Sequence, residues 1–109
     1  MSAFTPVTSE NFDTEVLHER RPVLLACVRR GLHFKEQTAA LAHLSEWYQA
    51  ALKVCLLDDD FIGAFKEQLG IEGSPTFIIL KSGNEQDRLL GQANRENLAA
   101  FVKHNLPTI

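Results

Sequence analysis

A short apolar run near the start of the chain, Val23–Val28, is the feature that most constrains the fold. Six apolar residues follow one another without a break and then stop at Arg29-Arg30-Gly31. A run so short and uninterrupted is typical of a strand that is buried on both faces, as in the middle of a parallel sheet. A helical pattern begins directly afterwards, and a buried strand that turns into a helix is where α/β proteins place functional groups. The run therefore predicts an α/β domain with a candidate site in the turn that follows it.

The rest of the chain supplies further strands and helices in alternation. Glycine, proline and capping residues separate apolar segments whose spacing is either continuous or near three to four residues. Strands are predicted over 4–7, 23–28, 54–57, 76–80 and 86–90, and helices after 8–10, over 32–52, over 61–69 and after 94. The order β-α-β-α-β-α-β-β-α predicts one domain, residues 1–109, with a central mixed sheet and helices on both faces.

Length and charge exclude several classes of protein. A chain of 109 residues with a net charge of −3 fits one domain and does not favour general affinity for nucleic acid. Its apolar runs are far shorter than the ~20 residues that cross a membrane, so no membrane partner is expected. The first residues, Met1–Pro6, lack the basic and then apolar pattern of a secretory signal. We expect a cytoplasmic location unless a leader has been removed.

Two groups of side chains, the two cysteines and a run of three aspartates, are candidates for a redox or metal site. Cys27 and Cys55 lie inside apolar runs without a nearby cysteine or histidine at metal-ligand spacing, so buried free thiols are expected. Cys27 lies two residues before Arg29, which leaves a reactive thiol as an alternative. Asp58-Asp59-Asp60 is interpreted as a solvated turn in which Asp60 caps the next helix. We therefore expect no metal and no cofactor.

Four segments spread along the chain match the pattern of one family. Leu69–Thr76 matches a Tyr-Gly-Ile-Arg-Gly-Ile-Pro-Thr loop, and Lys81-Ser82-Gly83 matches a Lys-Asn-Gly hairpin. Phe12–Leu17 matches a first-helix segment, and Gly91 with Ala93 matches the Gly-Ala before a last helix. These segments make the chain resemble the thioredoxin family over essentially its whole length. The resemblance implies a thioredoxin fold with a cis Ser74–Pro75 bond.

The chemistry of that family is not matched. The motif Trp-Cys-Gly-Pro-Cys-Lys falls on residues 30–35, where Gly31 and Phe34 take the positions of the cysteines, with Leu32 and His33 between them. Thiol–disulfide exchange needs an attacking thiolate and a resolving thiol, which glycine and phenylalanine cannot supply. We therefore expect no thiol–disulfide oxidoreductase activity.

The resemblance also places a buried Asp–Lys pair of the family at Leu25 and Leu56. We infer that these two positions share a face of the sheet, and that both halves of a costly buried ion pair have become apolar. Because side chains alternate along a strand, Cys27 would then share the face of Leu25, and Cys55 would point to the other side. No disulfide between the two cysteines is expected.

The surface around the altered motif is the remaining candidate site. Arg29, Arg30 and His33 form a basic rim beside the start of a helix, whose free N–H groups attract anions. The rim is either a solvated remnant or a docking site for an acidic peptide or another anion. The resemblance adds a peptide groove at Gly73, Ser74 and Pro75, which would bind by strand addition.

Two classes of function remain open. The first is a redox-inactive protein that binds a protein or peptide as an adaptor, an assembly factor or a chaperone-like partner. The second is an atypical thiol-dependent redox enzyme or a transferase that uses Cys27. The sequence leaves the identity of the partner and the oligomeric state open.

Overall fold

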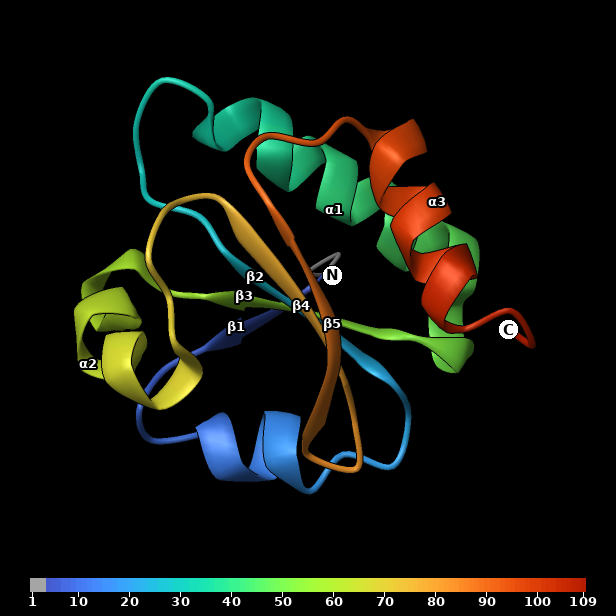
Figure 1. The fold of residues 1–109 in the computed structure, drawn as a ribbon, viewed down its shortest axis with the longest axis horizontal. Helices are drawn as coiled ribbons and strands as arrows, with labels where there is room; N and C mark the ends of the chain where they lie inside the picture. Colours follow the sequence, from blue (N-terminus) through green and yellow to red (C-terminus); the bar gives the residue numbers. More distant parts are fainter. Residues whose placement is uncertain (1–3) are drawn as a thin grey trace.

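A five-stranded mixed sheet forms the middle of the structure, a computed structural model that describes residues 4–109 (Figure 1). The strand order is β1-β3-β2-β4-β5. Strands β1, β3 and β2 run parallel, and β4 and β5 are antiparallel to their neighbours. Their bounds are Thr5–Val7 for β1, Val23–Cys27 for β2, Lys53–Leu57 for β3, Thr76–Lys81 for β4 and Asn84–Leu90 for β5. The predicted central mixed sheet is confirmed.

Helices cover both faces of this sheet, as predicted (Figure 1). One face carries α1 (Phe34–Tyr48), which continues into the short 3₁₀ turn η2 (Gln49–Ala51), together with α3 (Arg95–Asn105). The other face carries η1 (Asp13–Leu17) and α2 (Asp59–Leu69). Within the described residues, no helix is both long enough and apolar enough to cross a membrane. Residues 1–3, part of the segment inspected for a secretory signal, lie outside the described range.

Strand β2 is buried at every position, as the apolar run predicts. Its side chains alternate between two cores. On the α1 and α3 face, Leu24 packs in a cluster with Leu41 and Leu98. On the η1 and α2 face, Leu25 packs in a cluster with Phe12. Because β2 lies between β3 and β4, its backbone is paired on both sides, and this leaves only its ends free to carry a site.

The inferred sharing of faces along β2 and β3 is wrong. In the parallel register Leu25 lies opposite Cys55, and Leu56 lies opposite Ala26, so Leu25 and Leu56 point to opposite faces. Cys27 and Cys55 instead belong to the same core, on the η1 and α2 face. They remain free thiols because they are offset by two residues along the strands. Such diagonal neighbours lie about 7–8 Å apart, which is longer than disulfide geometry allows.

Helix ends follow the predicted signals with two differences. Gly70 ends α2 in the left-handed conformation with φ of 63°, and Asn94 caps α3 by accepting from the Asn97 N–H at 2.8 Å, both as predicted. The cap of α2 is Asp58 and not Asp60, because the Asp58 side chain accepts from the Asp60 N–H at 2.9 Å. The helix predicted over 32–52 is shorter, since α1 ends at Tyr48 and Gln49 has a φ of 43°.

Gln37 on α1 is buried, which is uncommon for a glutamine. Its amide donates to the Ala93 carbonyl and accepts from the Ala93 N–H, both at 3.2 Å. These two bonds satisfy both backbone groups of Ala93, a buried residue in the otherwise exposed loop before α3. The polar side chain therefore serves to join α1 to the loop between β5 and α3.

Lys53, the first residue of β3, places a buried ammonium group in an ion cluster whose other members are partly exposed. Its Nζ donates to the Glu15 carbonyl at 2.9 Å and approaches Glu15 Oε2 at 3.1 Å and Glu19 Oε1 at 3.3 Å. Arg21 binds the carboxylate of Glu19 with both its Nε and its Nη2 at 3.1 Å. A buried ammonium group is costly unless it is paired, so these carboxylates are needed where they lie. The cluster fastens η1 and its following loop to the end of the sheet opposite the turn after β2.

The ion cluster predicts a specific loss of stability in acid. Hydrogen bonds from Arg21 lower the pKa of Glu19 from its ordinary 4.5 to about 2. A carboxyl group with a lowered pKa in the folded state stabilises the fold above its unfolded-state pKa, and this contribution is lost as the pH falls through the folded-state value. The free energy of unfolding of Glu19→Gln should therefore lie below wild type above about pH 4.5, by at most about 3 kcal/mol, and the gap should close toward pH 2. A Glu46→Gln variant, at an exposed position on α1, is the control. A gap that does not change with pH would contradict the assignment.

Candidate functional site

The candidate site lies where the turn after β2 meets the loop before β4. The turn is closed by the Phe34 N–H, which donates to the Gly31 carbonyl at 3.2 Å. The loop contains a cis peptide bond between Ser74 and Pro75. A cavity of about 280 Å³ is lined by both segments and by Gln92, and a second cavity of about 350 Å³ lies along the loop and Gly91. The structure thus brings together the residues 31–34 and 73–75 that the sequence analysis selected.

The two cavities are flanked by exposed leucines. Leu32, in the turn, is 90% exposed, and Leu90, at the end of β5, is 64% exposed. Leu32 belongs to the lining of the first cavity and Leu90 to that of the second, and Ser74 and Pro75 belong to both. The sequence analysis named Leu32 only as a former motif position and missed Leu90. A usable signal was the placement of Leu32 directly after Gly31 in a turn, where no core is available to bury it.

The arginines of the predicted basic rim are paired with aspartates. Arg29 Nη1 lies 3.2 Å from Asp59 Oδ1. Arg30 Nη2 lies 3.0 Å from Asp60 Oδ1 and 3.4 Å from Asp58 Oδ1. Two arginines therefore face three aspartates, and the group carries a small excess of negative charge. The rim is not a free cationic surface, and the role of Arg29 and Arg30 in binding an anion stays a prediction.

Sequence reasoning missed this pairing, although a signal for it was present. β2 and β3 are adjacent and parallel, so the residues that follow them emerge at the same edge of the sheet. Arg29-Arg30 follow β2, and Asp58-Asp59-Asp60 follow β3. Two segments of opposite charge at equivalent ends of neighbouring parallel strands are expected to meet.

Two backbone amides of the same turn are also bound by side chains. The Arg29 N–H donates to Ser74 Oγ at 2.9 Å, and the Arg30 N–H donates to Asp59 Oδ2 at 3.0 Å. Ser74 lies in the loop before β4, and Asp59 is the first residue of α2. The turn after β2 is therefore tied to the loop before β4, which lines the site, and to the start of α2.

His33 does not form part of a catalytic arrangement in this structure. Its Nδ1 lies 3.9 Å from Glu36 Oε2, beyond hydrogen-bond distance, and has no hydrogen-bond partner among the described residues. General acid–base catalysis needs the histidine within hydrogen-bond reach of the group that it protonates or deprotonates, and nucleophile activation needs an orienting partner. The site offers His33 as a polar group at the rim of the first cavity.

The two thiols are buried in the core. Cys27 and Cys55 are both fully inaccessible, and burial raises the pKa of each to about 12. A thiol attacks or binds metal as the thiolate, which such a pKa suppresses at neutral pH. Among the described residues, no three histidine, cysteine, aspartate or glutamate side chains gather so that they could hold a metal ion.

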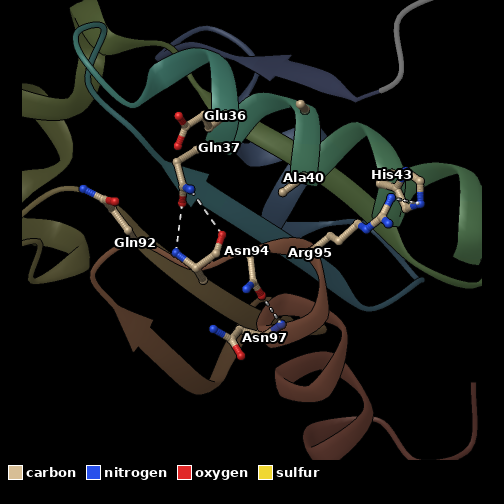
Figure 2. Close-up of a pocket in the computed structure, with 10 residues that line it drawn as sticks. Glu36, Gln37, Ala40, His43, Gln92, Asn94, Arg95 and Asn97 are labelled. Carbon is tan, nitrogen blue, oxygen red and sulfur yellow. Dashed lines mark hydrogen bonds between the residues drawn. The ribbon is translucent and has the colours of Figure 1, made fainter.

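A polar groove of about 590 Å³ lies next to the site, between α1 and α3 (Figure 2). Figure 2 shows Glu36, Gln37 and His43 on the α1 wall, with Arg95 reaching toward His43 from the start of α3 and the Asn94 side chain turned toward Asn97. Arg95 Nη1 lies 3.2 Å from His43 Nε2. Because a guanidinium group can only donate, Nε2 is the acceptor in this contact. The groove shares Gln92 with the first cavity but brings together no nucleophile with a base.

Comparison with known proteins gives one consistent result. A sequence model of the family described as Thioredoxin matches residues 3–104. The thioredoxin of Pseudomonas aeruginosa is 31% identical over 101 residues, which is 92% of this chain and 94% of that protein. Thioredoxin 1 of a Nostoc species is 27% identical over 107 residues, or 97% of this chain and 100% of that protein. A shorter match of 49 residues at 41% identity joins the chain to thioredoxin H4 of Arabidopsis thaliana, covering 44% of this chain and 40% of that protein.

The burial of the thiols predicts their behaviour toward a thiol reagent. In the folded protein Cys27 and Cys55 should react with an aromatic disulfide reagent far more slowly than in denaturant, where both should react at once, because neither sulfur is accessible. Absorbance of the released thiolate measures both rates, and a Cys55→Ala variant assigns the remaining signal to Cys27. Fast, stoichiometric labelling of Cys27 in the folded Cys55→Ala protein would contradict this prediction.

Proposed function

Because the chain belongs to the thioredoxin family, we propose that it is a redox-inactive member that binds a segment of another protein. The proposed binding face consists of Leu32, Leu90 and the loop residues Gly73, Ser74 and Pro75. In this role the protein acts as an adaptor, an assembly factor or a chaperone-like partner.

Three features support the absence of thiol–disulfide exchange. Gly31 and Phe34 stand at the positions where the family motif has cysteines, so the turn holds neither an attacking nor a resolving sulfur. The two cysteines that the chain does have are buried in one core. Burial raises the pKa of both to about 12, which suppresses the thiolate. The relatives named thioredoxin suggest a redox function, and the proposal departs from them on these positions.

The observation that carries the binding proposal is the exposure of two leucines beside the cis-proline loop. Leu32 is 90% exposed and Leu90 is 64% exposed, and the cavities that they border meet at Ser74 and Pro75. Burying one leucine side chain stabilises a complex by roughly 1.5–3 kcal/mol, so the face gains most from a partner that covers both. An extended peptide segment with apolar side chains fits this requirement.

The charges around the face favour an apolar partner segment over an acidic one. The sequence analysis expected Arg29, Arg30 and His33 to attract an acidic peptide. Asp58, Asp59 and Asp60 now stand beside those arginines, with contacts of 3.0 to 3.4 Å. The carboxylate of an acidic partner would have to displace aspartates that already bind the arginines. The new ion pair would itself be exposed, and an exposed ion pair contributes only about 0–1 kcal/mol. We therefore propose a partner segment whose recognition depends on apolar side chains.

The second candidate function is a thiol-dependent redox enzyme or a transferase that uses Cys27. It is supported by the relatives that are named thioredoxin. It requires the sulfur of Cys27 to reach solvent, although this residue is fully buried at the end of β2. Strand β2 would have to separate from its neighbours to expose it. The first proposal needs no such change.

Binding is tested with two matched peptides and two variants of the chain. The probes are blocked nonapeptides of glycine and serine with either two leucines or two aspartates at the centre. Wild type should bind the leucine peptide more tightly than the aspartate peptide, measured by fluorescence anisotropy of a labelled peptide. The double variant Leu32→Ser with Leu90→Ser should weaken binding of the leucine peptide at least about tenfold, because two apolar contacts are lost.

The control for that experiment is Trp47→Ser. Trp47 is also a large exposed side chain, with 58% of its surface accessible, but it lies in the last turn of α1 and lines neither cavity of the site. It should leave the affinity unchanged. Equal losses in the control and the double variant would place the binding elsewhere, and tighter binding of the aspartate peptide would overturn the apolar preference.

The redox part of the proposal is tested separately. With dithiothreitol as reductant, the protein should reduce a peptide disulfide no faster than dithiothreitol does alone, because the turn after β2 holds no sulfur. Product formation is followed by chromatography, with wild type beside Cys27→Ala. A rate above background that disappears in Cys27→Ala would establish the second candidate function instead.

A further inference from the structure

We infer that Asp59 is a positioning residue for the proposed binding face, acting through the backbone of the turn that carries Leu32. This inference rests on the proposed function, because it concerns the same face. Asp59 uses its two carboxylate oxygens on two neighbouring residues. Oδ2 accepts from the Arg30 backbone N–H at 3.0 Å, and Oδ1 accepts from Arg29 Nη1 at 3.2 Å.

The three aspartates at the start of α2 are not equivalent. The side chain of Asp59 is 20% exposed, against 40% for Asp58 and 78% for Asp60. Asp58 caps the helix, and Asp60 contacts the side chain of Arg30. Asp59 is the member of the group that binds a backbone amide of the turn. A carboxylate acceptor makes a backbone hydrogen bond shorter and stronger than a neutral acceptor does.

The tip of the turn depends on such bonds because it has little packing of its own. A methyl group placed on Gly31 would meet no atom within 4 Å, and Leu32 is 90% exposed. The tip is therefore fixed mainly through its two ends. On one side Asp59 and Ser74 bind the amides of Arg30 and Arg29, and on the other side Phe34 begins α1.

This arrangement connects a charged contact to an apolar binding face. A turn that is already ordered does not have to lose conformational freedom when the partner binds, and pre-organisation of this kind raises affinity. Removing the Asp59 carboxylate should release the Arg30 amide and let Leu32 move. The affinity for an apolar peptide should then fall although no atom in contact with the peptide has changed.

Three variants test the inference. Asp59→Ala removes all contacts of the Asp59 carboxylate with Arg29 and Arg30. Asp60→Ala removes another carboxylate from the first turn of α2, but one that accepts no hydrogen bond from the backbone of residues 29–33. Asp59→Asn removes the charge but keeps an oxygen that can accept from the Arg30 N–H. Hydrogen exchange of the Arg30 amide, followed by NMR, reports on the bond directly, because exchange requires the bond to open. Binding of the leucine nonapeptide and the melting temperature are measured in parallel.

Asp59→Ala should speed exchange of the Arg30 amide by about tenfold or more and weaken peptide binding several-fold. Asp60→Ala should change neither, and Asp59→Asn should restore most of the protection. Both alanine variants remove a carboxylate from the first turn of α2, so both should lower the stability of the helix by a similar amount. If their melting temperatures are similar, a difference in exchange or binding reports the positioning role of Asp59 and not a general loss of stability. Unchanged exchange in Asp59→Ala, or equal effects of Asp59→Ala and Asp60→Ala, would overturn the inference.

The two proposals fail in different ways. If wild type binds neither peptide, the proposed function is overturned, and the exchange comparison still decides whether Asp59 holds the turn. If the leucine peptide binds wild type and Asp59→Ala equally while exchange is faster, Asp59 orders the turn without positioning the face, and the inference is overturned while the proposed function stands.

Discussion

The burial of β2 between two neighbouring strands is the constraint on which the rest of the structure depends. Its five residues are all buried, and its backbone pairs with β3 on one side and β4 on the other. No residue within the strand can therefore carry a surface function. What the strand does is deliver the turn at 29–33 to one edge of the sheet, beside the segment that follows β3 and the loop that precedes β4. The candidate site exists because the ends of β2 and β3 and the start of β4 lie together at that edge.

The arginines at this edge are paired with aspartates of the same chain, and the proposed preference for an apolar partner follows from that pairing. Exposed ion pairs add little to stability, about 0–1 kcal/mol each, so the contacts of Arg29 and Arg30 with the aspartates are better understood as orienting the turn. Once the arginines are paired, the exposed apolar area of Leu32 and Leu90 is the strongest attraction that the face offers. In the proposed function, the acidic segment after β3 therefore shifts the expected preference toward apolar partners, although it lines neither cavity of the site.

The sequence predicts the elements well because burial and capping leave local signals, whereas contacts across the sheet do not. The apolar runs at 23–28 and 54–57 lie within one residue of β2 and β3, and Gly70 and Asn94 end and begin helices as expected. The prediction that Leu25 and Leu56 share a face of the sheet was wrong. It depends on the register between β2 and β3, and a shift of that register by one residue moves every side chain of a strand to the opposite face. The burial of Gln37 leaves no sequence signal for a related reason: helical periodicity separates polar from apolar residues but does not show that a buried backbone elsewhere needs an amide partner.

The corrected register also changes the argument about lost chemistry. If Leu25 and Leu56 faced one another, their apolar character would suggest that a buried ion pair had been removed as a unit. They instead belong to different sides of the sheet, Leu25 beside Cys55 in one core and Leu56 against the other. Each is explained by its own packing, because a charged group at either position would need a partner that its core does not provide. The proposed absence of redox activity therefore depends on Gly31, Phe34 and the burial of the two thiols, and it gains nothing from Leu25 and Leu56.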